Sequence, residues 1–183
     1  MLAALLLDRR GGLPAVLASD ASTLRAVIPE APDAIELLCA MRKLLLASLT
    51  PALRNGPVLD DPTALLSYLR ACIGHERREL FRILYLDAKL RLLTDEIAGI
   101  GSIRGVTAHP REILRRALEV GAAAIIPVHN HPSGDPSPSR QDVEWTQRLM
   151  RVAAELDLAV PDHLIVTAAS WSSLRSLGHM ERN

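Results

Sequence analysis

One short segment, residues 129–142, constrains this chain more than any other, and it reads HNHPSGDPSPSRQD. Side chains two residues apart on an extended strand project to the same side, so His129 and His131 can converge on one ion. Prolines and a glycine punctuate the following loop, which makes it stiff and turn-rich. The loop returns the chain to a predicted helix whose first turn holds Asp142. The segment therefore predicts a strand, a rigid loop and a helix that bring three polar side chains together.

Two imidazoles and one carboxylate form the kind of three-ligand set that catalytic zinc sites use, with a fourth position left for water. We predict that His129, His131 and Asp142 bind Zn²⁺, with the carboxylate oxygen at about 2.0–2.2 Å. A simpler interpretation stands beside this one. Ser139 and Asp142 have the spacing of a capping box, with Asp in place of the usual Glu, so the role of Ser139 could simply be to cap the helix. The histidines could then be surface residues of a loop.

A hydrolytic zinc site also needs a general base that takes a proton from water. The segment contains no glutamate, so it is not an H-E-x-x-H site and the base must come from elsewhere. Glu79 is our candidate because it stands at the start of an apolar run that reads as a strand. Glu76 and Glu96 are the alternatives, and each of the three could equally be a solvated strand end.

The second part of the chain alternates strand-like and helix-like patterns, which predicts an α/β fold. Strands are expected at residues 80–86, 90–93, 103–107, 122–128 and within 158–167, with helices starting near residues 110 and 142. The run that delivers His129 contains Pro127, which removes one backbone donor, so we expect a sheet edge or a bulge there. His163 falls in the last strand, and we expect it to support a ligand or the fold rather than to bind the ion itself.

The first part of the chain reads as helical throughout. The apolar start is a helix rather than a signal peptide, because it lacks a basic leading region and ends at a charged stretch. Residues 19–22 offer caps for a second helix, and Pro32 opens a long one that Pro51 and residues 55–57 should end. A further helix starts at Pro62. We therefore expect a helical module at residues 1–58 and an α/β domain at residues 59–183.

Charge and cysteine usage exclude several classes of protein. The chain has 21 basic and 21 acidic residues, so it has no global field that would attract nucleic acid or an anionic membrane. No run is long enough to span a bilayer. Cys39 and Cys72 do not fit a metal-binding CxxC spacing and are expected to be reduced thiols of a cytoplasmic protein. They also cannot supply the P-C-x-x-C of a zinc deaminase, which disfavours that activity.

The pattern H-x-H, seven residues, S, two residues, D matches the JAMM motif of MPN-type (JAB) metalloproteases. The longer string from His129 resembles the bacterial RadC branch, and three further stretches agree with it: residues 79–87, 109–113 and 162–166. The resemblance covers about residues 60 to 177. It implies a mixed, curved sheet flanked by helices, related in outline to the cytidine deaminase fold. It also implies zinc bound by His129, His131 and Asp142, a catalytic Glu79, and a Ser139 that stabilises the oxyanion.

By this resemblance the chain would be a zinc-dependent hydrolase of peptide or isopeptide bonds with a protein or peptide substrate, and a homo-oligomer is possible. RadC proteins usually carry a helix-hairpin-helix module with a glycine-rich hairpin. Here residues 24–34 lack those glycines and place Glu30 and Asp33 where phosphate would lie, so DNA binding is doubtful. The alternative function is a non-catalytic, metal-stabilised module in DNA-repair-associated complexes.

Overall fold

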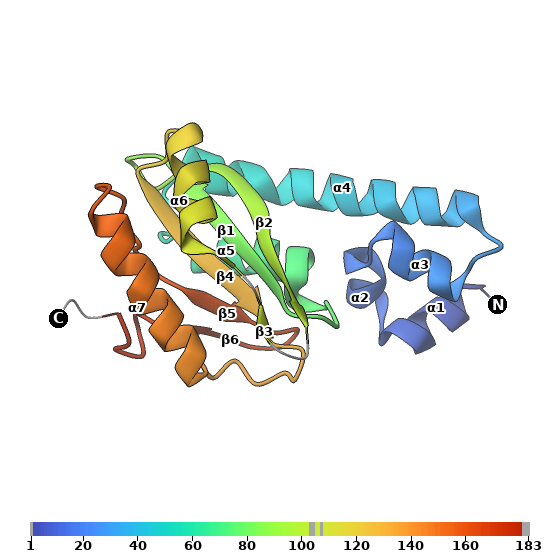
Figure 1. The fold of residues 1–183 in the computed structure, drawn as a ribbon. Helices are drawn as coiled ribbons and strands as arrows, with labels where there is room; N and C mark the ends of the chain where they lie inside the picture. The colour runs from blue at the N-terminus through green and yellow to red at the C-terminus, as the bar shows by residue number, and fades with distance from the viewer. Residues whose placement is uncertain (1, 103–104, 107, 181–183) are drawn as a thin grey trace.

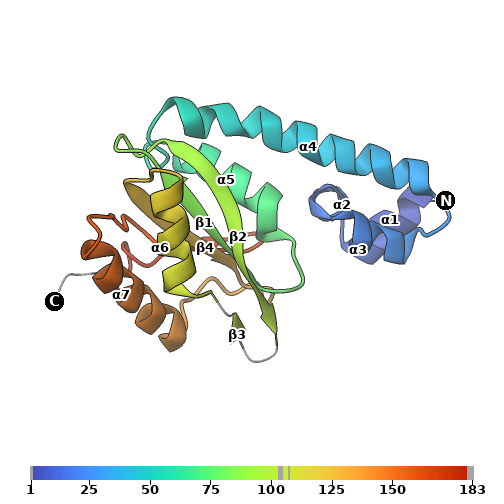
Figure 2. The same ribbon diagram turned by 45° about the horizontal axis from the view of Figure 1, so that its top comes forward.

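The computed structural model describes residues 2–102, 105–106 and 108–180. They form an open mixed sheet with the strand order β3-β2-β1-β4-β5-β6, helices on both of its faces, and a group of helices at the N-terminus (Figures 1 and 2). The helices are α1 (Leu2–Arg10), α2 (Leu13–Ala18), α3 (Ala21–Val27), α4 (Pro32–Asn55), α5 (Pro62–Leu69), the π-helical turn η1 (Arg70–Gly74), α6 (Pro110–Glu119) and α7 (Arg140–Ala154). The strands are β1 (Leu80–Leu86), β2 (Leu92–Ser102), β3 (Gly105–Val106), β4 (Ala124–Asn130), β5 (Leu164–Val166) and β6 (Trp171–Ser173). The predicted α/β class is confirmed.

The sheet is covered on both faces, which explains why its central strands are almost continuously apolar. Strand β1 pairs antiparallel with β2 and β4, and β4 pairs parallel with β5. Leu84 and Ile126 face α4, α5 and η1, whereas Ile83 and Ile125 face α6 and α7. His129 is also on β4, two register steps beyond Pro127, so it shares the face that α7 covers.

The N-terminal helices α1 to α3 and the first half of α4 enclose a small apolar core of their own, made of Leu6, Val16, Leu24, Ile28 and Ile35. The long helix α4 then leaves these helices and runs to the sheet, where Leu53 joins the core beside α5 (Figures 1 and 2). No helix of the described ranges combines the length and the apolar character needed to cross a bilayer.

The prediction that Pro51 ends the long helix is wrong, because α4 continues through it; the helix ends at Asn55, within residues 55–57, which were also predicted to end it. Proline removes the hydrogen bond to the carbonyl four residues earlier, which belongs to Ala47. Ala47 is exposed, so water can satisfy that carbonyl. Packing of Leu53 at the far end gives the helix a reason to continue beyond the proline.

The hairpin partner of β1 is longer than predicted and starts later, at Leu92 instead of residue 90. Leu90 lies in the turn with a positive φ of 58° and donates its N–H to the Asp87 carbonyl at 2.9 Å. The strand contains two glycines and two acidic residues, which are residue types that disfavour strands. The sequence pattern therefore did not indicate its full length. The predicted third strand contains β3, while Ile103, Arg104 and Thr107 lie outside the described residues.

Pro127 lies in β4, an interior strand, so the expectation of a sheet edge is wrong. Alternate residues of β4 direct their nitrogens toward β5, and Pro127 is one of them. On that side the pairing is interrupted between the Ala124–Ala159 bridge and the Val128–Leu164 pair, and the β5 side has one residue more than β4 across this interval. The missing donor of Pro127 therefore falls at an irregular, bulge-like place in the ladder.

Candidate metal centre

His129 lies on β4, a strand in which every residue is buried. Its side chain has no exposed surface, and its ring stacks on the ring of Phe81, the residue opposite it on β1, at 5.4 Å and 7°. An imidazole held between a strand and an aromatic ring has little freedom to turn. The fold thus fixes where the two ring nitrogens of His129 point.

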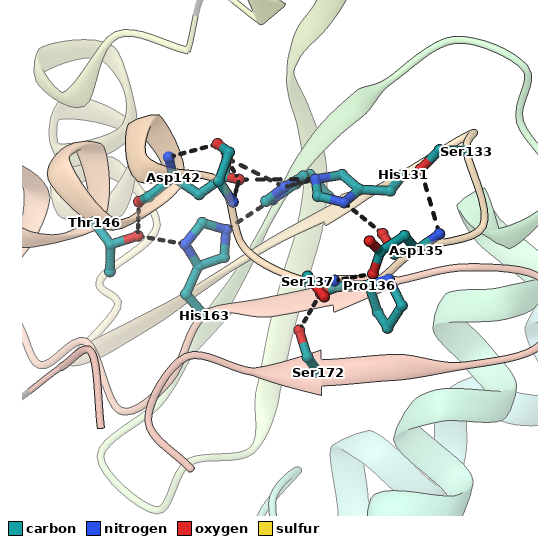
Figure 3. A network of polar contacts seen from close by, with 11 residues as sticks. His131, Ser133, Asp135, Pro136, Ser137, Asp142, Thr146, His163 and Ser172 are labelled. Atoms are coloured by element: carbon teal, nitrogen blue, oxygen red, sulfur yellow. Dashed lines mark hydrogen bonds and ion pairs between the residues drawn. The ribbon is translucent and has the colours of Figure 1, made fainter. Parts of the chain in front are cut away.

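His131 follows β4 directly and is held from two sides. Its backbone N–H donates to the Val166 carbonyl at 3.1 Å, which continues the pairing with β5. Its ring Nδ1–H donates to the Asp135 carbonyl at 2.8 Å, across the turn that begins the loop (Figure 3). Ser172 of β6 donates its hydroxyl to the Pro136 carbonyl and ties the loop to the sheet. The predicted stiffness of this loop therefore has a structural basis, and it leaves Nε2 of His131 facing His129.

Asp142 occupies the first turn of α7, and Ser139 is the N-cap of that helix. The capping box is complete, because Ser139 Oγ accepts from the Asp142 N–H at 3.2 Å and Asp142 Oδ2 accepts from the Ser139 N–H at 2.7 Å. The Ser139 hydroxyl also donates to Oδ2 at 2.6 Å. Capping and metal binding, which the sequence presented as alternatives, are therefore compatible here: the same contacts that start the helix aim the carboxylate at the histidines.

The side chains predicted from the motif converge with Glu79. We call Glu79, His129, His131 and Asp142 the metal group, and one possible ligand atom from each of them lies within 4.8 Å of the other three. Nε2 of His129 is 3.0 Å from Nε2 of His131 and 3.3 Å from Oδ1 of Asp142, and Oδ2 of Asp142 is 3.8 Å from Nε2 of His131. Ligands at about 2.0–2.2 Å from a tetrahedral zinc ion lie about 3.3–3.6 Å apart. The distance between His129 and Asp142 lies in this range, whereas the distance between the two histidines is shorter and that between Asp142 and His131 is longer. The donor set suits a metal ion, and shifts of a few tenths of an ångström would bring its spacing to that of tetrahedral zinc.

The electrostatics of Asp142 suit a cation. Burial alone would raise its pKa, but the charge of His129, present when that ring carries two protons, and the hydrogen bonds from Ser139 outweigh burial and hold the pKa well below its usual range. The carboxylate is therefore ionised at neutral pH, and this is the form that binds a metal.

His163 lies behind His129 and is completely buried, with its Nε2 at 2.9 Å from Nδ1 of His129. Burial lowers the pKa of His163 well below its usual value, and the neighbouring His129 lowers it further, so the ring is neutral. The other nitrogen of His163 is 2.5 Å from the hydroxyl of Thr146, which the sequence had not singled out. His163 thus supports the metal group through His129 and is not a member of it.

Of the three glutamates considered from the sequence, only Glu79 joins the metal group. It stands half-buried just before β1 and lines a cleft of about 540 Å³ together with His131, Asp142 and Trp145. Glu76 lines a different cavity, next to α1 and α3. The carboxylate of Glu96 pairs with the Arg116 guanidinium at 2.6 Å. Position therefore favours Glu79 as the base, while the role itself stays a prediction.

Asn130, the residue between the two histidines, was missed in the sequence. Its side chain is buried, and its Oδ1 accepts from the Leu80 N–H at 2.8 Å. Its amide donates to the carbonyls of Glu76 and Arg78, both at 3.1 Å. Through Asn130, strand β4 is hydrogen-bonded to the backbone on both sides of Glu79. The alternation of strand residues could have indicated that Asn130 points away from its neighbours, but not what it touches.

The open mixed sheet, the helices on both faces and the metal group at the end of β4 are the features of a JAB-type domain. A family model described as RadC-like JAB domain matches residues 59–179. The match spans more than half of the chain, and the chain therefore belongs to this family. The resemblance inferred from the motif is confirmed.

Proposed function

We propose that this protein is a zinc-dependent hydrolase of the JAMM type that cleaves a peptide or isopeptide bond in a protein or peptide substrate. The observation that carries the proposal is that possible ligand atoms of the metal group lie within 4.8 Å of one another, and that Glu79, His131 and Asp142 line a cleft. Three ligands with a neighbouring carboxylate match the needs of a metal-assisted hydrolysis.

Zinc in such a site supplies acidity, because it lowers the pKa of a coordinated water from 15.7 to about 7. His129, His131 and Asp142 would hold it. Their fit rests on the spacing of the donor atoms and on the ionised state of Asp142.

Glu79 would move the proton. Its carboxylate would accept a proton from the attacking water and then deliver it to the leaving amine nitrogen. Such a transfer needs a carboxylate held close to the reacting atoms. The hydrogen bonds of Asn130 to Leu80 and Arg78 hold the backbone around Glu79 in place.

Ser139 would stabilise negative charge on the substrate carbonyl oxygen. In the structure its hydroxyl proton is directed to Oδ2 of Asp142. One proton serves one acceptor at a time, so this role requires the hydroxyl to turn from Asp142 toward the substrate while the backbone N–H keeps hold of the carboxylate.

The proposal is tested by metal analysis and cleavage assays on matched variants. Purified wild-type protein should contain one zinc per chain, and Asp142→Ala should lose it. Against a panel of peptide and isopeptide substrates, Glu79→Gln should keep the zinc and lose cleavage, whereas Glu76→Gln, in the other cavity, should behave as wild type. An Asp142→Ala protein that retains stoichiometric zinc, or a Glu79→Gln protein that cleaves at the wild-type rate, would overturn the assignment. Zinc without any cleavage would favour the non-catalytic alternative.

A further inference from the structure

We propose that Thr146 and His163 are positioning residues that set the tautomer of His129 and so prepare its Nε2 to bind the metal. The inference rests on the proposed metal site and assigns it a supporting structure that the ligand motif does not contain.

The contacts form a chain inside the protein (Figure 3). Thr146 Oγ1 lies 2.6 Å from the Asp142 carbonyl oxygen and 2.5 Å from Nδ1 of His163. Nε2 of His163 lies 2.9 Å from Nδ1 of His129. Thr146, His163 and His129 have no exposed surface, so water does not compete for these hydrogen bonds.

Counting protons gives the direction of each bond. A carbonyl oxygen only accepts, so the single proton of the Thr146 hydroxyl is donated to Asp142. The hydroxyl therefore accepts from His163, whose proton must be on Nδ1. The ring of His163 is completely buried and neither of its nitrogens faces a carboxylate, so it is neutral and carries one N–H. Nε2 of His163 is therefore the acceptor of the next bond. The proton in that bond belongs to Nδ1 of His129.

With a proton fixed on Nδ1, a neutral His129 presents a lone pair on Nε2, the atom that faces His131 and Asp142. The opposite direction would put the His163 proton on Nε2 and make Nδ1 of His129 an acceptor. A neutral His129 would then carry its proton on Nε2, where the ion should bind. The hydroxyl of Thr146 thus decides between a ring that can bind the metal and one that is blocked.

His131 reaches the same state by an independent route, because its Nδ1–H donates to the Asp135 carbonyl. Asp142 takes part twice: its carboxylate faces Nε2 of His129, and its carbonyl anchors the hydroxyl of Thr146 one helical turn later. One turn of α7 therefore both contributes a ligand and orients another. Partners of this kind that hold a metal-binding histidine affect affinity by about 10- to 100-fold when they are removed.

The first test compares Thr146→Val, which keeps the shape and removes the hydroxyl, with Thr146→Ser, which keeps the hydroxyl. Zinc affinity is measured by competition with a chromophoric chelator at constant pH. We expect Thr146→Val to bind zinc about 10- to 100-fold more weakly than wild type, and Thr146→Ser to bind close to wild type. Equal affinity of all three proteins would overturn the proposal.

The second test observes the tautomers directly, by long-range ¹H–¹⁵N NMR of the imidazole nitrogens in zinc-free wild-type protein. We expect His163 and His129 to carry protons on Nδ1, and Nε2 of His163 to carry none. A proton on Nε2 of His163 would overturn the proposal even if Thr146→Val failed to fold. A wild-type protein that binds no zinc would instead defeat the proposed function, and the tautomers would still decide the proposal about Thr146.

Discussion

The metal group and the N-terminal helices show two different ways of stabilising structure. The metal group is surrounded by buried polar atoms, such as those of Asn130 and Thr146, each with defined partners. The N-terminal helices share a small apolar core, and leucines such as Leu37 and Leu44 of α4 remain exposed. Apolar contacts make a region compact, whereas satisfied polar networks specify one arrangement of side chains. A site that needs particular donor positions depends on the second kind.

Core truncations should give the largest effect and separate the two regions. Ile126→Ala in β4 and Leu24→Ala in α3 each remove a fully buried aliphatic side chain, for which about 2–5 kcal/mol of unfolding free energy is expected. Ile126→Ala should lower global stability in urea unfolding. Leu24→Ala should mainly increase hydrogen exchange in α1 to α3 and leave zinc affinity unchanged. Equal loss of zinc affinity in both variants would show that the two cores unfold as one unit.

Zinc should stabilise one region and not the other. Free zinc at 1,000 times its dissociation constant should add about 4.1 kcal/mol to the stability of the sheet domain, because only the folded site binds it. Amide exchange should slow in β4 and stay the same in α3, and a chelator should reverse the effect. Equal slowing in α3 would contradict the distinction between the regions.

Asn130→Ala should lower the unfolding free energy by a smaller amount, about 1–3 kcal/mol, because it leaves the buried Leu80 N–H without its acceptor. Urea unfolding and the exchange rate of the Leu80 amide measure the effect. Asn55→Ala, at the exposed end of α4, is the matched control and should stay within about 0.5 kcal/mol of wild type. If the two variants are equally stable, the hydrogen bonds of Asn130 to the segment that carries Glu79 do not stabilise the fold.

The smallest loss of stability is expected when two helix caps are removed. Ser139→Ala and Asp20→Ala each remove a side chain that accepts from the third backbone N–H of its helix, at a cost of about 1 kcal/mol. Thermal unfolding should show similar losses. Only Ser139→Ala should also weaken zinc binding, because it removes one of two hydrogen bonds that orient Asp142. A cap variant of α3 that changed zinc affinity equally would contradict this.

Local rules were enough to predict that His129, His131 and Asp142 come together. The period of a strand places His129 and His131 on one side, and a helix start after a rigid loop returns Asp142 to them. Glu79 was different, because residue reasoning left Glu76 and Glu96 open and the family resemblance selected it. The separation of Glu79 from Glu76 and Glu96 in space follows from strand pairing between distant segments, which no local sequence pattern can show.

The sequence indicated a supporting role for His163, but it could not show what His163, Asn130 or Thr146 contacts, for the same reason. Asn130 contacts backbone about 50 positions earlier in the chain, and His163 contacts His129, which lies 34 residues before it. An asparagine or threonine in such a place looks like any polar residue until the packing is known. The missed extent of β2 and the continuation of α4 through Pro51 are likewise cases in which tertiary contacts override local preference.

The long helix α4 has a consequence for how the chain can be divided. The division into residues 1–58 and 59–183 remains a prediction, and the family match also begins at residue 59. A fragment cut there would lose Leu53 together with the partly buried Leu46 and Leu49, which belong to or pack against the same apolar core as the leucines of α5. Bare apolar surface of this kind promotes aggregation. The smallest soluble piece that carries the metal group should therefore retain the second half of α4.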